Sequence, residues 1–325
     1  MITASRFRPA WWLPGAHLQT LYPSFARRRI VPELQRERLE LPDGDFIDID
    51  WAGNTLGPVV LVLHGLEGSL ESHYTGGILA ALAAQGYRAG LMYFRGCSGE
   101  PNRLPRSYHS GETGDLQTVI SRIGKSSPDK PLAVIGYSLG GNVLLKWLGE
   151  QGDKATITTA VAVSVPFELD CAARRLEQGL SRIYQNHLLK KLYQSVKSRA
   201  AIHPPTIPLQ ELPGLKTFRQ FDDAITAPLH GFRDVDDYYS QSSSRQYLRH
   251  IDVPVLIIHA LDDPFLPSGA IPKDAELSHA VTLELSRHGG HVGFVGGNTP
   301  LAAHYWLERR ICSHLQAYLQ GPLRW

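Results

Sequence analysis

The fold of this chain is decided by the stretch Leu132-Ala-Val-Ile-Gly-Tyr-Ser-Leu-Gly-Gly-Asn142. An apolar strand run ends at Gly136 and a helical run begins at Asn142, with a Gly-x-Ser-x-Gly pattern in the turn between them. The two glycines of the pattern leave room for a sharp turn that pushes the Ser138 hydroxyl outward. The following helix N-terminus favours developing negative charge. We therefore predict that Ser138 is a nucleophile; the alternative is an ordinary turn serine before a helix.

Short apolar runs bounded by turn residues recur on both sides of this stretch. They are continuous rather than alternating, which is typical of strands buried on both faces of a parallel sheet. Helical patterns lie between them, so the sequence predicts an α/β fold with a mostly parallel, doubly wound sheet. The expected strands are Val59–Leu63, Arg88–Tyr93, Leu132–Ile135, Thr158–Val163, Val255–His259 and Val281–Leu285. The expected helices are Gly76–Gln85, Thr113–Ile123, Asn142–Gly149 and Leu301–Leu319. Arg38–Leu41 and Phe46–Trp51 are expected to form a hairpin around Pro42-Asp43-Gly44-Asp45.

Three kinds of segment divide the chain. Residues 36–165 and 251–325 carry the strand–helix alternation and are expected to form the α/β core. Residues 166–250 lack a strong strand run, contain helical patterns at Cys171–Leu180 and His187–Arg199, and are expected to be a helical cap insert. Residues 1–35 are aromatic and basic without clear helical periodicity. We expect this N-terminal arm to pack its aromatics on the domain; the alternative is an anchor at a membrane surface.

Composition narrows the class of protein. The 325 residues are 43% apolar and 20% charged, and 33 Lys and Arg against 31 Asp and Glu leave a net charge of +2. Such a chain can bury a sizeable core, which excludes disorder as its main state. The near-balance of charge gives no reason to expect nucleic acid as a partner. Cys97, Cys171 and Cys312 are far apart and odd in number, so we expect no disulfide framework and a cytoplasmic location.

We expect neither a membrane-spanning segment nor a secretory signal in this chain. It has no run of about 18 apolar residues, so we expect no spanning helix. Pro9 and Pro14 interrupt the N-terminal stretch, which argues against a secretory signal. Peripheral contact with a membrane and the oligomeric state stay open.

A serine nucleophile needs a base, and the base needs an acid that orients it. Later loops of the chain offer candidates for both, in the order serine, acid, histidine. Asp263 follows the strand Val255–His259 and precedes Pro264, so we predict that it is the acid. Asp262 is the alternative acid, but we expect it to cap the turn through its own backbone. After the last expected strand, His291 follows two glycines that allow a close approach to the nucleophile. We prefer His291 as the base over His288, which we expect to hydrogen-bond locally.

An oxyanion hole needs two backbone N–H groups near the nucleophile. The residue after the serine, Leu139, is expected to give one of them. The second is expected from the loop His64-Gly65-Leu66-Glu67-Gly68 after the strand Val59–Leu63, with Leu66 preferred and Gly65 as the alternative.

Other polar residues on the same rim are predicted to be structural. Arg95 is expected to form a buried ion pair rather than to bind an anionic ligand, and Cys97 lacks a partnered base in the sequence. The histidines and acids show no metal-ligand spacing, and no nucleotide-binding glycine loop follows a strand, so no metal or cofactor is implied.

The motifs that carry a resemblance are spread over nearly the whole chain. They are Phe7-Arg8-Pro9-Ala10-Trp11-Trp12 with Gln19-Thr20, His64-Gly65-Leu66-Glu67-Gly68, Phe94-Arg95-Gly96-Cys97-Ser98-Gly99, Tyr108-His109-Ser110-Gly111, Gly136–Asn142, Asp262-Asp263-Pro264 and Gly289-Gly290-His291-Val292-Gly293-Phe294. Together they resemble the α/β-hydrolase superfamily, and within it the YheT-like branch, which also includes animal α/β-hydrolase-domain lipid hydrolases. Residues 166–250 contribute no matching motif.

The resemblance implies a serine hydrolase of carboxylic esters with short- to medium-chain acyl groups and no cofactor. It also implies Ser138, Asp263 and His291 as the charge-relay set. The substrate is expected to be a small-molecule acyl ester whose acyl pocket lies under the insert 166–250, with no substrate-binding residue yet assigned. The alternatives are an acyltransferase with the same three residues, a lyase, and a non-catalytic binding protein on this fold.

Overall fold

A computed structural model describes residues 1–319 of the chain. The last six residues of the expected core segment 251–325 lie outside the described residues. The strands of the main sheet are β1 (Ile2–Ala4), β2 (Gln35–Glu40), β3 (Phe46–Gly53), β4 (Val59–Leu63), β5 (Arg88–Met92), β6 (Leu132–Tyr137), β7 (Thr159–Val163), β8 (Val255–Ala260) and β9 (Val281–Ser286). Two short strands, β10 (Val295–Gly296) and β11 (His304–Tyr305), pair separately.

The nine strands of the main sheet lie in the order β1-β9-β8-β7-β6-β4-β5-β3-β2. All neighbours from β1 to β5 are parallel, whereas β3 runs antiparallel to β5 and β2 antiparallel to β3. This arrangement confirms the predicted α/β fold with a mostly parallel sheet, and the pair β2–β3 is the predicted hairpin.

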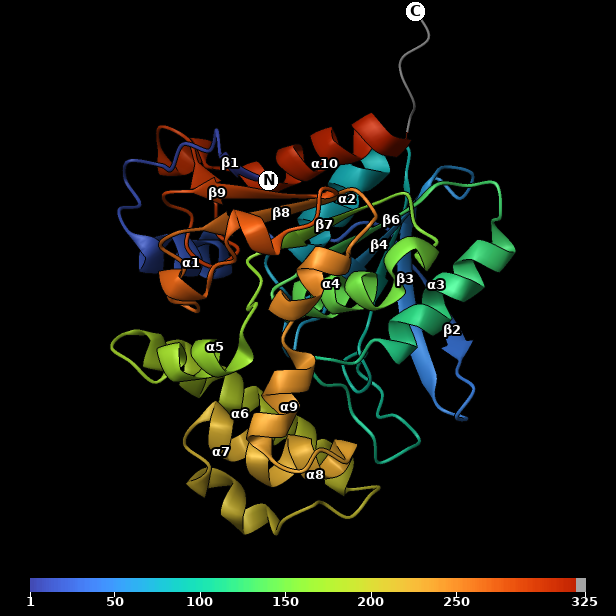
Figure 1. Cartoon of the computed structure of the whole chain (residues 1–325), viewed down its shortest axis with the longest axis vertical. Helices are drawn as coiled ribbons and strands as arrows, with labels where there is room; N and C mark the ends of the chain where they lie inside the picture. The colour runs from blue at the N-terminus through green and yellow to red at the C-terminus, as the bar shows by residue number, and fades with distance from the viewer. Residues whose placement is uncertain (320–325) are drawn as a thin grey trace, which may run out of the picture.

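Helices cover both faces of the sheet (Figure 1). Those of the core are α1 (Ala16–Ala26), α2 (Thr75–Ala84), α3 (Gly114–Ser126), α4 (Leu139–Gln151) and α10 (Trp306–Leu319). α2 and α10 pack together on one face, and α3 and α4 lie on the other. The sequence of β4 is apolar throughout because both faces of the strand are buried. Val60 and Val62 pack on the side of α2, and Leu61 and Leu63 pack on the side of α4.

A group of helices follows β7 and precedes β8 in the sequence, and it lies below the sheet in Figure 1. They are α5 (Leu169–Leu176), α6 (Ser181–Ala200), α7 (Phe218–Phe221), α8 (Ala227–His230) and α9 (Val235–Ser242). They share an apolar cluster of their own, which includes Leu176, Leu189, Leu212 and Phe221. The two helices expected in this segment are present as α5 and α6, and the segment contains no strand.

Element boundaries differ from expectation at several helices: α5 ends at Leu176 rather than Leu180, and α6 begins at Ser181 rather than His187. α4 begins at Leu139 rather than Asn142, because the chain becomes helical directly after Ser138. α10 begins at Trp306 rather than Leu301, because a 3-10 turn at Pro300–Ala302 and the strand β11 precede it.

The N-terminal arm holds two elements that the sequence did not indicate. β1 adds to the edge of the sheet beside β9, and α1 packs against the loop after β9. The buried face of α1 is formed by Gln19, Thr20 and Pro23, so it carries no apolar periodicity for sequence analysis to detect. Trp12 donates a hydrogen bond from its ring to the Gly297 carbonyl, whereas the side chain of Phe25 stays exposed. The expectation that the arm's aromatics pack on the domain therefore holds for only some of them.

None of the helices in residues 1–319 combines the length and the hydropathy needed to cross a bilayer.

Candidate active site

Ser138 lies in the sharp turn between β6 and α4. Its backbone has φ 52° and ψ −118°, a strained conformation for a residue with a side chain. The flanking glycines make this turn possible: a Cβ on Gly136 would lie 2.4 Å from the Gly140 carbonyl oxygen, and a Cβ on Gly140 would lie 2.6 Å from the His64 carbonyl oxygen. The turn therefore needs glycine at both positions, as the sequence predicted, and it presses against the end of β4.

Three side chains from distant loops form a continuous chain of hydrogen bonds. The Nε2 atom of His291 lies 2.9 Å from Ser138 Oγ, and its Nδ1 atom lies 2.9 Å and 3.2 Å from the two carboxylate oxygens of Asp263. A carboxylate only accepts hydrogen bonds, so Nδ1 carries the proton and Nε2 accepts from the serine hydroxyl. Asp263 and His291 are both buried. The structure thus brings together the three residues selected from the sequence.

The two residues that the sequence analysis set aside pair with each other instead. Asp262 lies 3.2 Å from the Nδ1 atom of His288, whose side chain is exposed. Its other oxygen accepts a hydrogen bond of 3.0 Å from the Gly290 N–H. Asp262 therefore braces the histidine loop from outside. The expectation that it caps its own turn is wrong, because its carboxylate turns toward Gly290 rather than back along its own segment.

Two backbone N–H groups near Ser138 have no hydrogen-bond partner among residues 1–319. They belong to Leu66, in the loop after β4, and Leu139, the first residue of α4; both residues line the same cavity as Ser138. The Gly65 N–H, the alternative, donates to the Tyr74 hydroxyl at 2.8 Å and is already in use.

His64 fixes the loop that holds Leu66. Its Nδ1 atom donates to the Gly65 carbonyl at 2.7 Å, and its Nε2 atom accepts from the Phe94 N–H at 3.1 Å. Burial lowers the pKa of His64 to about 4. The ring is therefore neutral near pH 7 and acts as a hydrogen-bonded strut between β4 and the loop after β5.

Two contacts of His291 were not foreseen from the sequence. The His291 N–H donates to the Thr20 hydroxyl of α1 at 2.9 Å, and the Phe265 ring stacks on the imidazole with centroids 3.8 Å apart and planes 4° from parallel. A Cβ on Gly290 would lie 2.5 Å from Thr20 Oγ1, so glycine is needed where α1 meets the loop. No local pattern marks Thr20 or Phe265, because both contacts arise only from tertiary packing.

The remaining rim residues are structural, as expected. Arg95 is buried and donates to both carboxylate oxygens of Asp115 at 2.7 Å, with Asp45 at 3.1 Å as a further partner. Burial raises the pKa of the Cys97 thiol well above its ordinary value, which disfavours the nucleophilic thiolate. Within residues 1–319 no group of three His, Cys, Asp or Glu side chains is placed to hold a metal ion.

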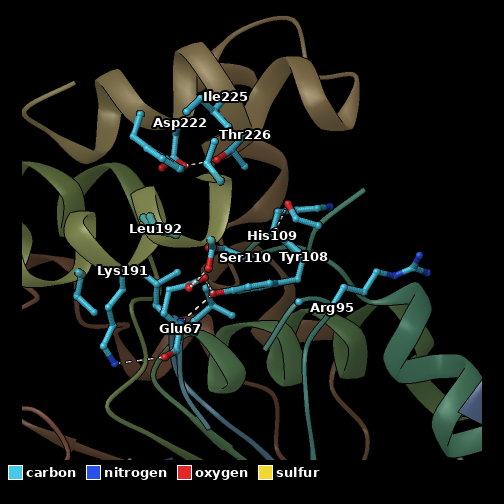
Figure 2. Close-up of a pocket in the computed structure, with 18 of the residues that line it drawn as sticks. Glu67, Arg95, Tyr108, His109, Ser110, Lys191, Leu192, Asp222, Ile225 and Thr226 are labelled. Atoms are coloured by element: carbon cyan, nitrogen blue, oxygen red, sulfur yellow. Dashed lines mark hydrogen bonds between the residues drawn. The ribbon is translucent and has the colours of Figure 1, made fainter. Parts of the chain in front are cut away.

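A cavity of about 500 Å³ opens beside Ser138. One wall comes from the core loops that follow β4 and β5, and the other from the helices of residues 166–250 (Figure 2). Apolar side chains of the helical wall include Leu169, Leu176, Leu192 and Phe221. Its volume is in the range of pockets that bind small molecules.

The fold and this site define an α/β hydrolase. The chain matches the family described as "alpha/beta hydrolase fold" over residues 58–297, and it belongs to that family.

Several known proteins are similar to this chain over most of its length. The chain is 43% identical over 325 residues to the protein named "Putative esterase YheT" of Escherichia coli (strain K12), covering 98% of this chain and 95% of that one. It is 30% identical over 330 residues to "Phospholipase ABHD3" of Mus musculus, covering 98% of this chain and 80% of that one. Among solved structures, the Pyrococcus furiosus esterase Pf2001 aligns with a TM-score of 0.59 at 18% identity, covering 99% of this chain and 98% of that one.

Proposed function

We propose that this protein is a serine hydrolase that cleaves carboxylic esters of short- to medium-chain acyl groups through Ser138, His291 and Asp263. The observation that carries the proposal is the unbroken series of hydrogen bonds from Asp263 through His291 to the Ser138 hydroxyl. The names of two relatives, an esterase and a phospholipase, both denote hydrolysis of esters, which supports this chemistry.

The geometry supports a two-step acyl transfer. His291 Nε2 takes the Ser138 proton as Oγ attacks the ester carbonyl, and Asp263 holds the imidazole in the required tautomer and stabilises the imidazolium. The free N–H groups of Leu66 and Leu139 would receive the oxyanion. The imidazolium then protonates the leaving alcohol, and water, activated by the same histidine, releases the acid from the serine.

The cavity supports an acyl ester as substrate. Its apolar helical wall offers a surface for an acyl chain, and its volume is that of a pocket for a small molecule rather than a long groove. Residues 166–250 would act as a cap that forms this wall and limits the access of water.

Substitution of the nucleophile is the direct test. We expect Ser138→Ala to abolish turnover of p-nitrophenyl butyrate and covalent labelling by a fluorophosphonate probe, because no other hydroxyl is placed beside His291 Nε2 within residues 1–319. The circular dichroism spectrum and the melting temperature should stay close to those of the wild type. Turnover that persists in this variant would refute the assignment. Product analysis with an added alcohol acceptor separates hydrolysis from acyl transfer.

A further inference from the structure

One face of α6 presents basic side chains to the cavity. Lys191, Ser195 and Arg199 are spaced four residues apart, so they lie on the same side of the helix. All three line the cavity that contains Ser138. Leu188 and Leu192 of the same helix also line it, so the charges border an apolar wall.

The carboxylate of Glu67 faces this basic stripe but is already occupied. Its oxygens accept hydrogen bonds from the Tyr108 hydroxyl, at 2.8 Å, and from the Ser195 hydroxyl. Lys191 donates to the Glu67 backbone carbonyl at 3.4 Å rather than to the carboxylate (Figure 2). Lys191 and Arg199 therefore bring two positive charges against the single negative charge of Glu67.

Arg199 is the cation of this cavity that lacks a partner. Among residues 1–319, no carboxylate lies within 4.0 Å of its guanidinium, and its side chain donates no hydrogen bond. The other arginines of the cavity are paired, Arg95 with Asp115 and Arg106 with Glu112. Burial lowers the pKa of Arg199 below its ordinary value, and the nearby charge of Glu67 offsets this only in part.

Other titratable groups around the cavity do not supply the missing negative charge. Burial lowers the pKa of His109 and of His230 to about 3, so both rings are neutral near pH 7. Asp222 lies on the wall opposite Glu67 and Lys191 in Figure 2, where it accepts hydrogen bonds from the Thr226 and Tyr239 hydroxyls. An anionic ligand would therefore avoid the Asp222 wall and meet the α6 stripe.

The stripe leads from the site of chemistry to the surface. Glu67 directly follows Leu66, so Ser195 contacts the cavity close to the free Leu66 N–H. Arg199 lies one helical turn further along α6, a rise of about 6 Å. Gln194 and Ser198 line the cavity and are exposed, so the cavity reaches solvent along this part of the helix.

We propose that Arg199, with Lys191 two turns away on the same face of α6, binds an anionic group of the substrate, a carboxylate or a phosphate, while the ester carbonyl lies at Ser138. This inference rests on the proposed ester hydrolysis and adds a substrate class to it. A guanidinium donates two parallel hydrogen bonds to either group, which gives both affinity and orientation.

The test compares matched pairs of neutral and anionic esters. The acyl-side pair is p-nitrophenyl hexanoate and the mono-p-nitrophenyl ester of hexanedioic acid, which has a free carboxylate. The alcohol-side pair is hexanoylglycerol and hexanoylglycerol phosphate. The wild type should favour the anionic member of one pair, which identifies the side of the ester that carries the charge. In Arg199→Gln the ratio of kcat/KM for anionic over neutral ester should fall about 10- to 100-fold, the value of a lost charge-assisted hydrogen bond.

Control variants separate recognition from general effects. Arg199→Lys should retain part of the discrimination, and Lys197→Gln, on the exposed side of the same helix, should leave it unchanged. In a Ser138→Ala background, the preferred anionic ester should raise the melting temperature, and the added Arg199→Gln substitution should remove this effect. Turnover of neutral esters without any charge preference would overturn this inference alone. Turnover of no ester in either pair would count against the proposed function itself.

Discussion

Ser138 shows how strain at one residue is tied to its chemistry. Its positive φ is held by two glycines that no larger residue can replace without backbone contact, and this conformation points Oγ at His291. A further strained residue follows the imidazole: Val292 has φ 58°, and its N–H donates to the Ser164 hydroxyl. Backbone strain is therefore present at one partner of the central hydrogen bond and at the residue that follows the other.

The acid of the site is tested by a change that keeps its shape. We expect Asp263→Asn to lower kcat for p-nitrophenyl butyrate by roughly three to four orders of magnitude, because an amide no longer holds the imidazole in the useful tautomer or stabilises its charge. Steady-state kinetics on the purified variant measure this.

The neighbouring acid provides the matched control. Asp262→Asn should cost far less activity, because an amide oxygen can still accept from the Gly290 N–H. Equal losses in the two variants would show that Asp263 has no special role.

The residues of the site differ in how far the sequence could predict them. Ser138, Asp263 and His291 each follow a recognisable strand in the order expected for this fold, so chain order, loop position and the neighbouring glycines and proline selected them. Their catalytic roles stay a prediction. Thr20 and Phe265 reach His291 through packing between distant segments, which leaves no local pattern. Arg199 could not be selected from the sequence, because nothing in its local pattern distinguishes it from the other basic residues of α6. Only the structure shows that it lines the cavity.

At the scale of elements, α1 braces the histidine loop. The Thr20 hydroxyl accepts from the His291 N–H, and the Gln19 side chain bonds both the N–H and the carbonyl of Val295. His17 of the same helix lies 2.9 Å from the Tyr184 hydroxyl of α6. α1 therefore contacts both the loop that carries the base and the helix that borders the cavity.

The brace predicts an effect of a distant helix on the site. We expect Thr20→Val to lower the free energy of unfolding by about 1–3 kcal/mol and to lower kcat, because a buried N–H next to the imidazole loses its acceptor. Thr20→Ser, which keeps the hydroxyl, should resemble the wild type in both respects. Urea unfolding and ester kinetics on the three proteins give the comparison; a fully active, fully stable valine variant would contradict the role of α1.

Across the whole molecule, buried neutral histidines link stability to pH. Burial lowers the pKa to about 4 for His64, His259 and His314, and to about 3 for His73, His109 and His230. Unfolded histidines titrate near 6.5, so below that pH the unfolded chain binds more protons than the native one. Asp222 and Asp115 oppose this trend, because burial raises the pKa of Asp222 to about 6 and that of Asp115 above its ordinary value.

The free energy of unfolding should therefore fall as the pH drops from about 6.5 toward 4, by about 1 kcal/mol per pH unit for each such histidine. Denaturant unfolding at pH 7.5, 6.5 and 5.5 measures the slope. His314→Gln should make the slope shallower, since the glutamine can still bond Thr159 without titrating. An equal free energy of unfolding at all three pH values would show that protonation of these histidines does not destabilise the folded protein.

The overall architecture was more predictable than its details. Continuous apolar runs identified the six central strands, because a strand buried on both faces has no polar side. β1 was missed because three residues at a sheet edge, mostly exposed, carry too little pattern. The helices of residues 166–250 were expected as a class, but the cavity they form with the core depends on their packing and not on their periodicity.

The pairing of β1 with β9 ties completion of the site to the synthesis of segments far later in the chain than the N-terminal arm. β1 lies beside β9, and 271 residues separate Thr20 from His291. A ribosome adds about 5–20 residues per second, so the arm emerges roughly 15–50 s before its partners exist. From its own synthesis until His291 follows 153 residues later, Ser138 lies in the nascent chain without its base. Fragments released before His291 is made would thus hold a serine with no imidazole beside it, and the proposed hydrolysis would begin only once His291 has been added.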